Sequence, residues 1–78
     1  MKIGKLHQIN YAVPLYKEKA GFNAHFLFYL KDLEVVTILD IKEDASDSIL
    51  RIRILTDKGN VGWIIMTQNT VPYSICRI

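Results

Sequence analysis

The sequence predicts a single all-β domain, a small barrel of five or six short antiparallel strands spanning residues 1–78. The main observation is the segment from Glu34 to Met66, where two β-branched runs flank a polar loop and a tight turn leads into a third run. The second is size: 78 residues, half of them hydrophobic, suffice for one packed core. A single flat sheet would leave one apolar face uncovered, so we expect closure into a barrel.

The N-terminal third predicts two strands separated by a polar turn. Residues 9–16 form an extended segment, in which Pro14 indicates a sheet edge or a strand end. Residues 22–30 alternate as a strand would, although Phe22, Phe26 and Leu30 also fit the spacing of a helix. Their aromatic residues favour a strand. Helix remains the alternative for residues 23–31.

The central segment predicts an internal strand followed by an alternating one. Residues 34–41 are apolar on both faces for most of their length, which is typical of a central strand. After a polar loop at residues 43–48, Leu50, Ile52 and Ile54 are expected to face the core and the intervening arginines the solvent.

Two turns divide the C-terminal third. Residues 57–60 have the Gly and Asn of a hairpin turn, because both residues tolerate positive φ. Residues 61–66 form the returning strand, and residues 71–77 a last strand interrupted by Pro72.

Composition limits the location and the partners. The formal charge of +2 comes from ten basic and eight acidic residues that are scattered, so it gives little support for a nucleic acid partner. The one cysteine, Cys76, forms no internal disulfide, and the N-terminus lacks an apolar signal segment, so we expect a cytoplasmic protein. The longest apolar run, Phe26 to Leu30, is far shorter than the ~20 residues of a membrane span, and no membrane association is expected.

Two passages resemble a known family. Residues 30–39 are similar to a "leucine, lysine, small turn, then Val-x-Val-Leu" passage, and residues 59–64 to a "Gly-x-x-Gly-Trp-Val" signature. Both belong to the bacterial SH3 (SH3b) group of SH3-like barrels, which the chain resembles over about residues 11–66. The resemblance implies an SH3-like barrel and a binding role toward peptides, cell-wall glycans or nucleic acids, without naming the ligand.

An aromatic rim is the first candidate site, for a protein or peptide ligand. It comprises Tyr16, Tyr29, Trp63 and Tyr73, because a chain this small has more aromatic rings than it can bury. The competing interpretation of Trp63 is structural: its ring covers one barrel end while Gly62 lets the neighbouring backbone approach.

A basic set is the second candidate site, for nucleic acid phosphates. It comprises Lys42, Arg51, Arg53 and Lys58. The competing interpretation is an ordinary ladder in which the arginines pair across the strands with Asp40 and Glu34.

Nothing in the sequence predicts catalysis, a cofactor or a metal. His7 and His25 have no companions at metal-ligand spacing, and no serine or acidic pair carries a nucleophile signature. Cys76 is expected to pack as a small hydrophobe. We therefore expect a binding module that is not an enzyme. A further alternative is a homo-oligomer whose function arises only in the assembly.

Overall fold

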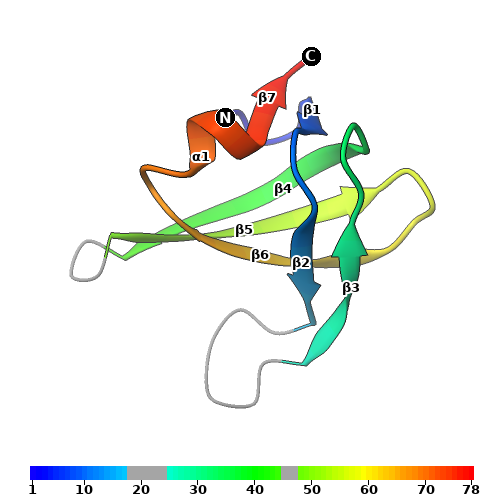
Figure 1. Cartoon of the computed structure of the whole chain (residues 1–78), viewed down its shortest axis with the longest axis horizontal. Coiled ribbons are helices and arrows are strands. Elements are labelled where there is room, and N and C mark those ends of the chain that lie inside the picture. Colours follow the sequence, from blue (N-terminus) through cyan, green and yellow to red (C-terminus); the bar gives the residue numbers. More distant parts are fainter. Residues whose placement is uncertain (18–24, 45–47) are drawn as a thin grey trace.

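A computed structural model describes residues 1–17, 25–44 and 48–78 of the chain, in which one antiparallel sheet curls strongly into a half-barrel (Figure 1). Its strands follow the order β3-β2-β6-β5-β4-β1-β7. Their bounds are β1 Leu6–Ile9, β2 Val13–Tyr16, β3 Phe26–Leu30, β4 Val35–Asp44, β5 Ile49–Thr56, β6 Val61–Thr67 and β7 Ile75–Arg77, with a one-turn helix α1 at Val71–Ser74. The predicted small all-β antiparallel domain is confirmed, with seven strands in the described residues.

The curl is visible in the way β1 and β2, consecutive in the chain, lie far apart in the sheet. β1 pairs with β4 and β7, whereas β2 pairs with β6 and β3. The turn between β3 and β4 then returns to β1, where Leu33 N–H donates to the Ile9 carbonyl (2.5 Å) and Ile9 N–H to the Glu34 carbonyl (2.8 Å). These two bonds tie the β2–β3 end of the sheet to the β1 end.

The concave side of the sheet holds one apolar core. The predicted inward residues Ile52 and Ile54 are fully buried, and Leu50 packs against them partly buried. Each fully buried aliphatic side chain stabilises the fold by about 1.5–3 kcal/mol. The buried apolar residues are Ile9, Leu15, Leu30, Val36, Ile38, Ile52, Ile54, Ile64 and Ile75.

A β-bulge shifts the inward positions of β4, which are Val36 and Ile38 before it and Ile41 after it. Ile38 lies opposite Ile54, but the next pair along the ladder is Asp40 with Arg53, so Leu39 is an extra residue on β4. The extra residue restores the register that puts Ile41 opposite the buried Ile52.

The predicted hairpin at residues 57–60 is confirmed. Thr56 N–H donates to the Asn60 carbonyl at 2.8 Å, and Gly59 has a φ of +87°. Only glycine adopts that backbone conformation without steric strain.

The structure corrects the prediction of a strand over residues 71–77. Residues 71–74 form helix α1 rather than the start of a strand, because Pro72 lies in the first turn, where its missing N–H has no helical partner to lose. The strand is shortened to β7. Cys76 is exposed rather than packed against the barrel, and its Sγ accepts a hydrogen bond from Asn10 Nδ2 at 2.9 Å.

The segment with a competing helical interpretation forms strand β3, as predicted. A register shift opposite Leu15 and Tyr16 interrupts the alternation of β3, and Leu30 is its one buried residue. The predicted positions 22–24 lie outside the described residues. In the described ranges no helix is long and apolar enough to cross a membrane.

Candidate binding face

A row of five cross-strand partners crosses the convex side of the sheet. Phe26 of β3 is the partner of Tyr16 of β2, and Tyr16 is the partner of Trp63 of β6. Trp63 in turn lies opposite Arg53 of β5, and Arg53 opposite Asp40 of β4. Neighbouring strands are about 4.8 Å apart, so these positions lie side by side over roughly 19 Å. We call these five residues the outer row.

Strand alternation fixes the direction of the outer row. Trp63 lies between Gly62 and Ile64, which are both buried. Since successive side chains point to opposite faces of a sheet, Trp63 faces outward. The same argument applies to Arg53, which lies between two fully buried isoleucines, and to Tyr16, which follows the fully buried Leu15.

Gly62 makes the central pair of the row possible. A β-carbon at position 62 would lie 2.6 Å from Leu15 Cγ and 2.9 Å from the Tyr16 carbonyl oxygen. β2 therefore approaches β6 more closely than any side chain at position 62 would allow. This confirms the predicted role of Gly62, and it brings Tyr16 beside Trp63.

The rings of β2 and β3 form edge-to-face contacts. Tyr16 and Phe26 have ring centroids 6.2 Å apart with planes at 68°, and Phe26 and Tyr29 are 5.1 Å apart at 63°. Such pairs contribute about 0.5–1.5 kcal/mol beyond the area they bury. We call Tyr16, Phe26, Tyr29 and Trp63 the aromatic cluster. The predicted aromatic rim did not include Phe26.

The structure brings together three of the four predicted aromatic residues. Tyr16 and Trp63 are half-buried cross-strand partners, and Tyr29 joins them through Phe26. Tyr73 lies on α1, which packs against β7 at the other end of the strand order. Tyr73 is 72% exposed and is not part of the cluster.

Three of the four predicted basic residues share the convex face. Lys42 is the cross-strand partner of Arg51, and Arg53 follows Arg51 by two positions on the same side of β5. We call Lys42, Arg51 and Arg53 the basic ladder. Lys58 lies in the hairpin turn, five residues beyond Arg53, and does not belong to it.

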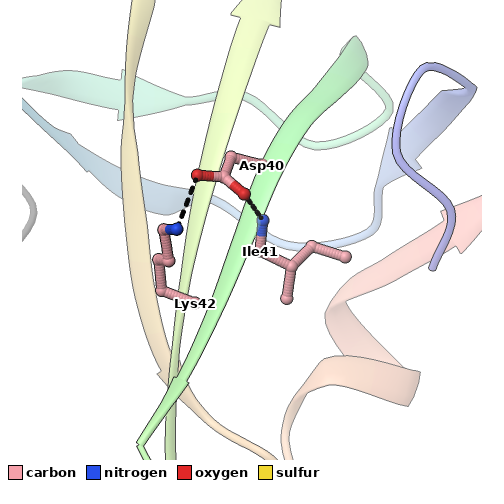
Figure 2. A network of polar contacts seen from close by, with 3 residues as sticks. All are labelled: Asp40, Ile41 and Lys42. Carbon is pink, nitrogen blue, oxygen red and sulfur yellow. Dashed lines mark hydrogen bonds and ion pairs between the residues drawn. The ribbon is translucent and has the colours of Figure 1, made fainter.

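Asp40 is the acidic partner of this ladder. Its Oδ2 lies 3.5 Å from Lys42 Nζ, and its Oδ1 accepts a hydrogen bond from Ile41 N–H at 2.9 Å (Figure 2). Exposed pairs of this kind contribute less than about 1 kcal/mol, so Lys42 is available to a ligand. Arg53 is the cross-strand partner of Asp40, as the ladder interpretation predicted, while the ion pair of Asp40 is with Lys42.

The predicted pairing of the arginines with Glu34 is wrong. Glu34 lies in the turn before β4, where its Oε1 accepts a hydrogen bond from Lys31 N–H at 3.1 Å. The Glu34 carbonyl also accepts a hydrogen bond from Ile9 N–H, so Glu34 lies beside β1 and not beside the arginines of β5.

His7 is a buried polar residue that the sequence analysis considered only as a metal ligand. Its Nδ1 lies 3.0 Å from the Lys5 carbonyl oxygen, and its Nε2 accepts a hydrogen bond from Lys2 N–H at 3.3 Å. Both ring nitrogens thus hold the N-terminal segment. In the described residues no three His, Cys, Asp or Glu side chains gather as metal ligands would.

Comparison of the chain with protein-family models, with curated proteins and with solved structures finds no match. The candidate face therefore rests on the geometry described above.

Proposed function

We propose that this protein is a small binding module that holds a peptide segment of a partner protein on its convex face, against the aromatic cluster. The observation that supports this most is the outer row, which places three aromatic rings side by side on three paired strands. Rings fixed by strands lose little conformational entropy when a ligand binds, so each ring surface contributes more to affinity.

The chemistry of the cluster suits an extended peptide with apolar or proline side chains. Tyr and Trp rings present an apolar surface and a polar tip, which is the usual lining of grooves that recognise proline-rich segments.

The proposal includes no catalytic step. It also retains two sequence-based expectations, a cytoplasmic location and kinship with the bacterial SH3-like barrels, the latter supported by the curled sheet and by the close approach at Gly62.

A matched pair of tyrosines tests the proposal. The probe is a displayed library of random peptides selected on the immobilised protein, followed by titration of the selected peptides. Tyr29→Ala removes a 62% exposed ring of the cluster, whereas Tyr73→Ala removes a 72% exposed ring outside it. We expect Tyr29→Ala to weaken binding at least tenfold and Tyr73→Ala to leave it within twofold. Equal effects of the two changes, or no selectable peptide, would contradict the proposal.

A second candidate function is binding of single-stranded nucleic acid. It is favoured by one observation: Arg53 is the direct cross-strand partner of Trp63, so the basic ladder adjoins the aromatic cluster. Bases that stack on aromatic rings while phosphates meet nearby arginines are typical of such proteins.

Salt dependence separates the two functions. If nucleic acid is the ligand, binding of a labelled oligonucleotide should fall steeply between 50 and 200 mM salt, about tenfold or more for several phosphate contacts. Arg53→Gln should reduce that slope, whereas Lys58→Gln, in the hairpin, should not. Release of the oligonucleotide in the lowest-salt wash would rule this candidate out.

A further inference from the structure

Arg53 is the one cation of the outer row, and it lies directly beside Trp63 as its cross-strand partner. Its side chain is exposed on the convex face, because both of its neighbours on β5 are buried isoleucines. Across residues 1–17, 25–44 and 48–78, its guanidinium forms no ion pair and no side-chain hydrogen bond. All of its donors are therefore open to a ligand that lies on the aromatic cluster.

The carboxylate opposite Arg53 is engaged elsewhere. Asp40 is the cross-strand partner of Arg53, but its Oδ2 lies 3.5 Å from Lys42 Nζ. Its Oδ1 accepts a hydrogen bond from Ile41 N–H at 2.9 Å, and Figure 2 shows the carboxylate between these two groups. Together, Asp40 and the basic ladder carry three positive charges and one negative charge. This end of the outer row should therefore attract an anion.

We propose that the peptide held on the convex face carries an acidic residue, whose carboxylate binds Arg53 while an apolar or proline residue of the same peptide lies on Tyr16 and Trp63. The inference rests on the proposed peptide-binding function and adds the chemical class of the partner segment. The planar fork of an arginine binds a carboxylate through two parallel N–H···O bonds, which orient the ligand as well as attract it. Arg53 thus determines specificity.

The sheet determines the spacing between the two parts of the ligand. Tyr16, Trp63 and Arg53 are consecutive in the outer row, so across the strands Arg53 is about 4.8 Å from Trp63 and roughly 9.6 Å from Tyr16. An extended peptide rises about 3.3 Å per residue, and a polyproline II segment about 3.1 Å. The acidic residue should therefore follow or precede the apolar one by two or three positions.

The composition of the outer row favours a peptide over a strand of nucleic acid. Arg53 is its single cation, and the next position beyond it is the carboxylate of Asp40. A peptide can place one carboxylate at Arg53 and none beside Asp40. A nucleic acid carries a charge on every nucleotide, so a strand along the row would bring further phosphates to the rings or to Asp40.

The peptides that the wild-type protein selects from the displayed random library test the spacing. We expect them to share an apolar or proline residue with an aspartate or glutamate two or three positions away. Replacing that acidic residue by its amide keeps the shape and removes the charge. This change should weaken binding about three- to tenfold, as loss of one partly exposed charge-assisted contact does.

A charge reversal distinguishes a direct ion pair from general attraction. Arg53→Glu and Lys58→Glu change the net charge equally, but Lys58 lies in the hairpin turn outside the basic ladder. Arg53→Glu should weaken the acidic peptide at least tenfold and should prefer the same peptide with lysine at the acidic position. Lys58→Glu should leave the affinity for each peptide within twofold of the wild type. Circular dichroism checks the folding of both variants.

The outcomes separate this inference from the function on which it rests. Selected peptides that need Tyr29 but lack an acidic residue, or that bind Arg53→Glu as tightly as the wild type, would overturn the inference and leave peptide binding intact. If no peptide is selected, both fail. A labelled oligonucleotide that binds more tightly than the selected peptides, and that Arg53→Glu releases, would assign Arg53 to phosphates and also overturn the inference.

Discussion

Gly62 and Leu15 lie so close together that a methyl group at position 62 would meet Leu15 Cγ at 2.6 Å. The same methyl would also approach the Tyr16 carbonyl oxygen at 2.9 Å. A side chain can turn away, but a backbone oxygen moves only with its strand. The contact therefore sets how closely β2 packs on β6, and through that pairing the position of Tyr16 beside Trp63.

Gly62→Ala should accordingly move β2. We expect a loss of about 1–3 kcal/mol in the free energy of unfolding, the usual range for overpacking. Urea denaturation measures it. The control is Gly59→Ala in the hairpin. A β-carbon there would have no non-neighbouring atom within 4 Å, so only backbone strain opposes the change. The Trp63 emission maximum should shift in Gly62→Ala and not in Gly59→Ala. Unchanged emission in both would show that Gly62 does not set the β2–β6 contact.

The inward alternation of β5 gives a second prediction. Ile54→Ala should reduce the free energy of unfolding by about 2–5 kcal/mol, because it opens a cavity in the core. Val61→Ala, at an exposed position on the neighbouring strand, should reduce it by less than about 1 kcal/mol. Chemical denaturation of both variants is the measurement. Similar losses for the two would contradict the inward orientation of Ile54.

The central strands could be predicted because their signals are local. β-branched residues, period-two alternation and a Gly-Asn turn depend only on neighbours in the sequence, and β4, β5 and β6 follow them. The helix at residues 71–74 could not be distinguished in this way. Pro72 is compatible both with the first turn of a helix and with an interrupted strand. Which of the two forms depends on how the chain reaches β7.

The candidate binding face was harder to predict from the sequence, because its residues become neighbours only when strands that are distant in the sequence pair. Arg53 was expected on the solvent side, and Trp63 either in the aromatic rim or over one barrel end, but only the β5–β6 register makes the two residues partners. The exposure of Phe26 depends on the register shift between β2 and β3, which has no signature in the sequence. Tyr73 was grouped with the other rings by residue type alone.

Trp63 provides the third prediction. Its half-buried outward position predicts fluorescence that a neutral quencher reduces, though less than for free tryptophan. Trp63→Ala should then reduce the free energy of unfolding by less than Ile64→Ala, its fully packed neighbour on the opposite face. Full protection from the quencher, or a loss of about 3–5 kcal/mol on Trp63→Ala, would show that Trp63 is a core residue and remove it from the binding face.

The final prediction concerns His7, whose ring is buried while both of its nitrogens are in hydrogen-bonding range of backbone groups. Nδ1 has the carbonyl oxygen of Lys5 as its partner, and a carbonyl can only accept, so the proton must be on Nδ1. Nε2 is then free to accept from Lys2 N–H. The ring therefore holds the N-terminal segment in a single tautomer, beside the first strand.

His7→Leu keeps most of the volume and removes both bonds. We expect it to lower the free energy of unfolding by about 1–3 kcal/mol, because it leaves partly buried backbone groups without a partner. Amide exchange at Lys2 should also accelerate, since its N–H loses its acceptor. Tyr11→Leu, at a 61% exposed position, is the control and should change neither quantity to the same degree. If Lys2 exchange were the same in wild type and His7→Leu, the ring would be only a space-filling part of the core.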